Sequence, residues 1–231
     1  MKYIRIRLIY LALLVVCCFV IRCSKDKYYF DGGIVDPRFN GTMLEYLESK
    51  PIEFDSLVTI IRLSGLEENF NKDTMTFFAP PDYSIGRAIE RANDLLYSAG
   101  MDTLVSLDQV PPEIWKKYLE KYMFHGANKL NDYYQLDLSL ENAFPGQDYF
   151  SYNNTVFNIG VIYDDANGVK YGGYRHILFS YIPDLKHPQD GWVSSNISSC
   201  NIQPENGIVH TLTNTSIFGF TGFTDDVMAS F

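Results

Sequence analysis

The residues of this 231-residue chain that could do chemistry are scattered and form no recognisable catalytic motif. No two histidines have the spacing of metal ligands on a helix or turn. The glycine patterns of a nucleophile elbow, a phosphate loop or a dinucleotide site are also absent. The sequence therefore predicts no catalytic residue, no cofactor-binding residue and no metal ligand; its four histidines are His125, His176, His187 and His210.

Two pairs of adjacent carboxylates are the remaining candidates for acid and base chemistry. Asp164 and Asp165 are neighbours, as are Asp225 and Asp226. Neighbouring side chains on a strand point to opposite faces, so adjacency in sequence does not create the facing carboxylates of a glycosidase. A glycan or ester hydrolase is therefore only a remote alternative, and we expect a protein that is not an enzyme.

Aromatic side chains are the feature that suggests binding. Aromatic residues make up 15% of the chain, and 17 of them are tyrosines. Exposed tyrosine and tryptophan rings can stack on sugars or fill pockets on a partner protein, although they also pack in cores and at sheet edges. The sequence predicts a protein or glycan partner, with five candidate binding aromatics: Tyr133, Tyr134, Tyr171, Tyr174 and Trp192.

The first 22 residues have the pattern of a secretory signal. A basic start precedes an uninterrupted apolar run, residues 8–21, which is too short to span a bilayer comfortably. The Cys23-Ser-Lys-Asp that follows resembles the end of a bacterial lipoprotein signal, which implies lipidation of Cys23 and attachment to the membrane. Arg22 departs from the small residue usual before that cysteine, and Cys17 and Cys18 compete as lipidation sites. A simple cleaved signal and an uncleaved anchor are the alternatives.

The charge balance disfavours nucleic acid as a partner. Removal of residues 1–22 takes away four of the 19 basic residues and none of the 28 acidic ones, which changes the net charge from −9 to −13. Binding to nucleic acid depends on lysine and arginine neutralising phosphates. Residues 23–41 have no extended apolar period and are expected to be a lipidated tether. Cys200, the only cysteine beyond residue 23, is expected to be an ordinary packed residue.

A short strand that ends at two prolines organises the rest of the chain. The apolar residues from Thr76 lead to Pro80 and Pro81, which cannot donate to a sheet ladder. Asp82 or Ser84 is expected to cap a helix that runs to about residue 98. An earlier helix is predicted from Phe54, with its apolar residues at helical spacing.

These segments resemble the signature boxes of the fasciclin (FAS1) domain. Thr-Phe-Phe-Ala-Pro-Pro-Asp is similar to the first box, and Asn-Gly-Ile-Val-His-Thr-Leu, residues 206–212, is similar to the second. Met123 stands where the family often has a histidine, so recognition placed around that histidine in animal relatives is not expected here. The matching signature residues are Thr76, Phe77, Phe78, Ala79, Pro80, Tyr122, Asn206, Gly207 and His210.

The resemblance implies an α+β fold, a wedge-like β-sandwich of about seven strands with helices packed along one side. One domain is expected over residues 42–224, with an insertion around 184–200 and a tail at 225–231. The two boxes should lie side by side. Residues 156–163 and 169–174 are expected to form a hairpin, residues 176–182 another strand, and residues 217–223 an edge strand.

The resemblance also implies a non-enzymatic adhesion or binding module. Together with the proposed anchor it predicts a lipoprotein of the Bacteroidetes type in the bacterial cell envelope, at the surface or periplasmic face of the outer membrane. A structural accessory subunit of an envelope polysaccharide-uptake complex is the alternative.

Overall fold

The computed structural model describes residues 36–188 and 190–231, and residues 37–231 form one compact unit. The expected signal and Cys23, the expected lipidation site, lie outside the described residues. Among the residues described, no helix is both long and apolar enough to cross a membrane.

The strands form one hydrogen-bonded sheet with the order β2-β1-β7-β6-β5-β4-β3. Strands β1 and β7 are parallel, with Phe78 opposite His210, and the other neighbours are antiparallel. The two signature boxes therefore lie side by side, as predicted. The strands are β1 (Met75–Ala79), β2 (Met123–His125), β3 (Gln147–Phe150), β4 (Val156–Tyr163), β5 (Arg175–Tyr181), β6 (Val193–Ile202) and β7 (Gly207–Leu212).

The sheet curls until distant strands face one another across its interior. The rings of Phe78 on β1 and Phe179 on β5 stack with centroids 4.1 Å apart, although two strands separate them in the sheet. At one end the two edges meet, because the backbone N–H of Tyr152, just after β3, donates to the Met123 carbonyl of β2 at 2.9 Å. This curling produces the two packed β layers expected from the sequence within a single near-barrel sheet.

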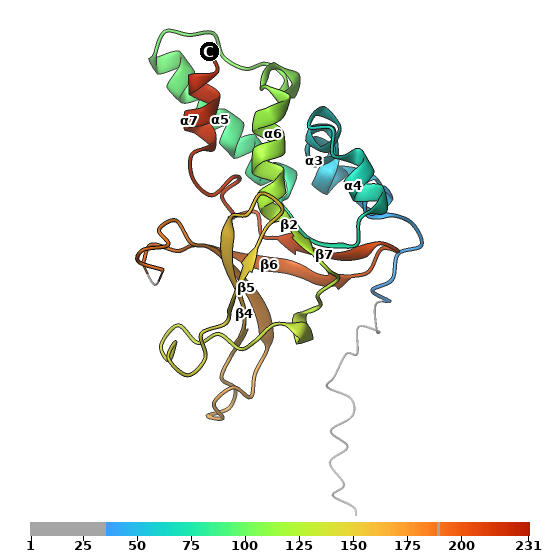
Figure 1. Cartoon of the computed structure of the whole chain (residues 1–231), viewed down its shortest axis with the longest axis vertical. Coiled ribbons are helices and arrows are strands. Elements are labelled where there is room, and N and C mark those ends of the chain that lie inside the picture. Colours follow the sequence, from blue (N-terminus) through green and yellow to red (C-terminus); the bar gives the residue numbers. More distant parts are fainter. Residues whose placement is uncertain (1–35, 189) are drawn as a thin grey trace, which may run out of the picture. The chain divides into compact units, whose positions relative to one another are not determined.

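The longer helices gather on one side of the sheet (Figure 1). Gly65, which follows the C-cap of helix α3 (Pro51–Leu63), has φ +72°, as expected for a left-handed residue beyond a helix end. The mixed α and β architecture predicted from the sequence is confirmed. The helices are α2 (Met43–Glu48), α3 (Pro51–Leu63), α4 (Glu67–Lys72), α5 (Asp82–Ser98), α6 (Pro112–Leu119) and α7 (Phe223–Ala229), with short 3-10 turns at Leu107–Gln109, Glu120–Tyr122 and Leu130–Asp132.

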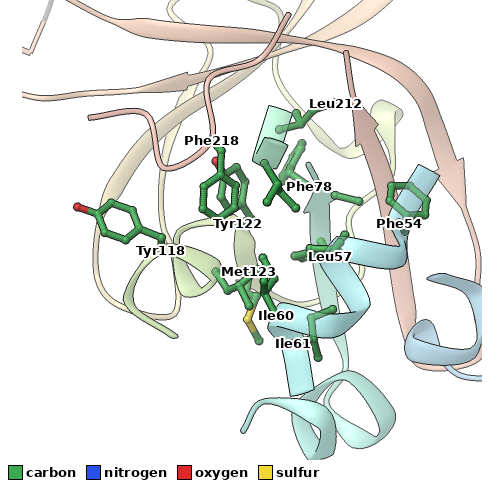
Figure 2. Close-up of a cluster of buried hydrophobic side chains, with 14 of the residues drawn as sticks. Phe54, Leu57, Ile60, Ile61, Phe78, Tyr118, Tyr122, Met123, Leu212 and Phe218 are labelled. Carbon is green, nitrogen blue, oxygen red and sulfur yellow. The ribbon is translucent and has the colours of Figure 1, made fainter. Parts of the chain in front are cut away.

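A continuous apolar core joins the helices to the sheet. Leu57 and Ile60 of α3 belong to one cluster of buried hydrophobic side chains with Phe78 of β1 and Leu212 of β7 (Figure 2). Burial of each such side chain contributes about 1.5–3 kcal/mol. The apolar period read from the sequence of α3 is therefore the face that attaches the helical layer.

Two sequence expectations in the β region are wrong. Residues 169–174 are not a strand: β4 pairs with β5, and residues 164–174 form the connection between them. The expected insertion at 184–200 is also too long, because Val193–Ile202 is strand β6, between β5 and β7. Of the expected insertion, the described residues 184–188 and 190–192 lie outside the sheet.

Both ends of the domain extend further than expected. The Phe39 N–H donates to the Gln203 carbonyl at 2.9 Å, so residues 37–41 belong to the domain rather than to a tether. Residues 217–223 form turns instead of an edge strand, and residues 223–229 form α7 instead of a tail. The hydroxyl of Tyr118 on α6 donates to Asp226 at 2.8 Å and holds α7 in place.

Asp82 caps a different helix from the one predicted. The N-cap of α5 is Pro81, and no side chain caps that helix. Helix α3 instead breaks helical geometry at Phe54, with φ −137° and ψ 16°, so the helical segment after the break has its own free N–H groups. Asp82 accepts from two of them, the N–H groups of Ser56 at 2.9 Å and Leu57 at 3.0 Å. It therefore acts as an N-cap supplied from a remote part of the chain.

Replacement of Asp82 should destabilise the domain. Asp82→Ala leaves two helix-start N–H groups without their acceptor, and we expect a loss of about 1–2 kcal/mol in the free energy of unfolding. Asp94 is an exposed residue of α5, the helix that also contains Asp82. Asp94→Ala is therefore the matched control and should change the free energy of unfolding by less than about 0.5 kcal/mol. Chemical denaturation of both variants measures the difference. Equal stabilities would show that Asp82 is not a cap.

His210 is a buried neutral imidazole beside the first signature strand. Its Nε2 lies 3.0 Å from the Asn128 carbonyl, and its Nδ1 accepts from the Asn201 N–H at 3.4 Å. This pattern requires one protonated ring nitrogen, so the neutral tautomer with the proton on Nε2 fits the site. Burial lowers the pKa of His210 to about 4, against the bond to Asn128, which raises it.

The free energy of unfolding should therefore fall on mild acidification. Between an unfolded pKa near 6.5 and the folded pKa of His210, which is about 4, the unfolded chain binds the extra proton. Stability is lost as the pH falls through this window, by roughly 2 kcal/mol between pH 6.5 and 5. Denaturation of the protein and of His210→Gln at both pH values tests this. The fall in the free energy of unfolding between the two pH values should be smaller in His210→Gln than in the unmodified protein. Equal falls in both proteins would show that His210 is not the group responsible.

Candidate ligand-binding surfaces

The signature residues hold the fold, and most of them are buried. Thr76, Phe78 and Tyr122 are fully buried. Thr76 accepts from the Asn128 N–H at 2.8 Å and donates to the Gly126 carbonyl at 2.7 Å. Phe77, Ala79, Pro80 and His210 are also buried, while Asn206 and Gly207 are half-buried at the start of β7.

The five candidate aromatics do not form one platform. Tyr133 is buried against the rings of Phe78 and His210, so its assignment as a binding residue is wrong. Tyr134 is 66% exposed and Tyr174 is 69% exposed, with Tyr174 stacked on His176. Trp192 lies in the loop of residues 184–192, where its Nε1 donates to the Pro188 carbonyl at 2.6 Å. Tyr171 lines a cavity.

That cavity, of about 460 Å³, lies between two loops, and we call it the loop-end pocket. The two loops, residues 136–144 and 164–174, lie at the end of the sheet away from the helices (Figure 1). Tyr163 and Tyr171 supply rings with centroids 6.4 Å apart, inclined at 79°. The pocket is lined by Leu136, Asp137, Leu138, Ser139, Ile162, Tyr163, Asp164, Asp165, Lys170 and Tyr171.

Asp137 ties the two loops together. Its carboxylate accepts from the Ser139 hydroxyl at 2.6 Å, from the Ser139 N–H at 2.9 Å and from the Tyr171 hydroxyl at 2.8 Å. These bonds, first those from Ser139 and then that from Tyr171, lower the pKa of Asp137 to about 2. Lys170 lies 3.7 Å from the same carboxylate. Asp137 is therefore ionised at neutral pH, so it is not suited to act as a general acid.

The backbone around Tyr171 is also fixed by a side chain. Tyr171 has φ +61°, an uncommon value for a bulky residue, and its N–H donates to Asp165 at 2.8 Å. Phe144, in the opposite loop, packs edge-on against the Tyr171 ring with centroids 5.5 Å apart. The ring is thus held in one orientation by contacts from both loops.

A second hollow lies where α3 and α5 begin, and we call it the α3/α5 groove. Ile52 is 100% exposed and Tyr83 is 60% exposed on its walls. The hollow measures about 510 Å³ and is lined by Ser49, Lys50, Pro51, Ile52, Glu53, Pro81, Asp82, Tyr83 and Asn214. This groove was not predicted from the sequence, although Ile52 is an apolar residue outside the apolar face of α3 and could have indicated it.

A buried lysine was also missed. Lys121 donates from Nζ to the Gly219 carbonyl at 3.1 Å, and the same nitrogen lies 4.5 Å and 5.1 Å from the ring centroids of Tyr118 and Tyr181. Burial lowers its pKa to about 8. These contacts fasten the turn before α7 to the rest of the domain. Its Nζ is enclosed by protein groups, so we treat it as structural.

No metal centre is found in the part of the chain that the structure describes. There, no group of three or more histidine, cysteine, aspartate or glutamate side chains could hold a metal ion. Cys200 is half-buried, and burial raises the pKa of its thiol.

The chain resembles a known protein in its structure. No family model matches the chain, and no curated protein matches it. Among solved structures, the chain is similar to a FAS1 domain pair from the insect cell adhesion molecule fasciclin I, with 15% sequence identity and a TM-score of 0.48. The likeness covers 74% of this chain and 49% of that one, so this chain spans about half the length of the structure it matches.

Proposed function

We propose that the chain is a non-enzymatic, fasciclin-type binding module of the bacterial cell envelope that recognises a glycan through the loop-end pocket. The supporting observation is the pairing of two inclined tyrosine rings with carboxylates and a lysine in one exposed hollow. Sugar rings present apolar faces that stack on aromatic rings, and their hydroxyls donate to carboxylates and accept from ammonium groups.

The pocket chemistry favours binding over hydrolysis. A glycosidase needs one carboxyl group that is protonated at the working pH and one that is ionised. The pKa of Asp137 is lowered to about 2 by its bonds to Ser139 and Tyr171, which leaves it without a proton to donate. The same bonds make it a fixed acceptor, and fixed groups lose little conformational entropy when a ligand binds.

We further propose that lipid on Cys23 attaches the domain to the membrane, at the surface or periplasmic face of a Bacteroidetes outer membrane. The lipoprotein-like Cys-Ser-Lys-Asp after an apolar run supports this location. One acyl chain binds a membrane only marginally, so stable attachment requires more than one chain.

The α3/α5 groove supports a second candidate, a structural accessory subunit of an envelope complex. A fully exposed isoleucine beside an exposed tyrosine is the composition of a protein contact rather than of a sugar site. Polysaccharide uptake is the process that we would assign to such a complex.

Glycan binding is tested with replacements in the loop-end pocket. On a polysaccharide array followed by titration calorimetry, Tyr163→Ala should weaken binding about tenfold or more, equivalent to about 1.4 kcal/mol. Tyr171→Phe keeps the ring but frees Asp137, and should weaken binding less. Tyr97→Ala is the matched control, because Tyr97 is 78% exposed and belongs to helix α5.

Two results would reject the glycan proposal. One is a protein that binds no glycan on the array, and the other is an equal loss in Tyr163→Ala and Tyr97→Ala. A protein partner recovered by crosslinking that is lost in Ile52→Asp would then favour the accessory subunit.

The anchor is tested independently of the ligand. Metabolic labelling with a lipid precursor should mark the protein, and Cys23→Ser should abolish the label because the acceptor thiol is gone. Cys200→Ser, which alters a cysteine of the folded domain, is the control and should keep the label. Persistent labelling of Cys23→Ser would move the site to Cys17 or Cys18.

A further inference from the structure

Three Asn-Gly steps occur in the chain, at Asn40, Asn167 and Asn206. In such a step the glycine backbone nitrogen can approach the asparagine Cγ, because glycine has no Cβ to obstruct the approach. The structure places the three Asn-Gly dipeptides in different surroundings. Because the two reacting residues are the same at each site, any difference in reactivity between the sites must come from the fold.

Asn206 is held at its side chain. Its Oδ1 accepts from the Met43 N–H at 2.7 Å, and its Nδ2 donates to the carbonyls of Phe70 at 2.9 Å and Asp73 at 3.1 Å. Gly207 also packs so closely on Met75 that a Cβ there would collide with the Met75 carbonyl. The amide of Asn206 can turn towards the Gly207 nitrogen only if these contacts open together.

Asn40 is held at its backbone on both sides. The Phe39 N–H donates to the Gln203 carbonyl at 2.9 Å, and the Glu205 N–H donates to the Gly41 carbonyl at 2.9 Å. Its side chain is exposed. Reaction at Asn40 therefore requires the first residues of the domain to separate from the segment before β7.

Of the three asparagines, Asn167 has the fewest contacts that restrain it. It and Gly168 are exposed at the tip of the β4–β5 connection, in a two-residue turn closed by the hydrogen bonds Ala166 N–H to Val169 carbonyl, 3.1 Å, and Val169 N–H to Ala166 carbonyl, 2.9 Å. The Gly168 N–H takes no part in these two bonds. Asn167 has φ +52° and Gly168 φ +78°, so a non-glycine residue occupies the left-handed region. Opening of this tip disturbs only local contacts.

We propose that Asn167 is a site of spontaneous deamidation. The Gly168 backbone nitrogen, after losing its proton to solvent, attacks Cγ of Asn167 and forms a new C–N bond. The side-chain nitrogen takes up a proton and leaves as ammonia, which produces a cyclic succinimide. Water then adds to one of the two ring carbonyls, and the ring opens to aspartate or isoaspartate. Water is the only co-reactant, and no atom is oxidised or reduced.

The modification would change the wall of the loop-end pocket. Either product adds a negative charge close in sequence to Asp164 and Asp165, and isoaspartate also lengthens the main chain by one carbon within the turn. The Asp165 carboxylate holds the Tyr171 N–H at 2.8 Å, so a lengthened turn would disturb the segment that orients the Tyr171 ring. The modification itself is independent of whether that pocket binds a glycan.

The test is mass spectrometry of the full chain incubated in mildly alkaline buffer, then digested and separated. The peptide with Asn167 should gain the mass that replaces an amide NH2 by OH, and should split into aspartate and isoaspartate forms. Its rate should exceed that of Asn40, and exceed that of Asn206 by about tenfold or more, since reaction at Asn206 requires a larger opening. In denaturant the three rates should converge.

Two variants complete the experiment. Gly168→Ala should slow the reaction at residue 167, since a Cβ then obstructs the attacking nitrogen. In Asn206→Ala, which removes the tether at β7, Asn167 should still react ahead of Asn40. The proposal is overturned if Asn167 stays unmodified while Asn40 or Asn206 reacts, or if the three sites react equally in the folded protein.

Discussion

The parallel pairing of β1 with β7 is the constraint on which the rest of the structure depends. Its register is fixed at one end by Asn206, whose side chain bonds to the start of α2, the end of α4 and the residue after α4. Gly207 then lets the two backbones approach closely. Because these contacts join segments more than a hundred residues apart, a single polar side chain sets the position of two helices relative to the central strands.

The curling of the sheet follows from the contacts of Phe78, which β1 carries on its inner face. Phe78 stacks on Phe179 at 4.1 Å and on His210 at 5.1 Å, so strands from both halves of the sheet converge on one ring. A flat sheet could not bring β1 and β5 together with two strands between them. Most of the residues that carry the family resemblance are therefore used in the interior, and the two candidate ligand surfaces lie elsewhere, in the connections and at exposed helix starts.

The sequence was informative where a pattern is local, and misleading where a residue acts at a distance. The helical period of α3 and the prolines after β1 predicted elements that the structure contains. Strand β6 was missed because Val193–Ile202 is rich in serine and asparagine, and its register shifts against β7. Asp82 was assigned to its own helix, since nothing in its neighbours indicates the break at Phe54 that it caps. Tyr171 was predicted as a binding residue, but its partner Asp137 comes from the opposite loop and becomes a neighbour only when the two loops close on one another.

The same dipeptide illustrates how surroundings decide what a sequence means. At residues 206–207, asparagine and glycine are architectural, because three hydrogen bonds and a close backbone contact occupy both. At residues 167–168 they form a turn that only two local hydrogen bonds close. Contacts with helices and core strands confer high local stability, whereas a hairpin tip opens at small cost. The end of the sheet that carries the candidate ligand pocket thus also carries an Asn-Gly turn that only local hydrogen bonds close, so a chemical change in this turn leaves the contacts of the core in place.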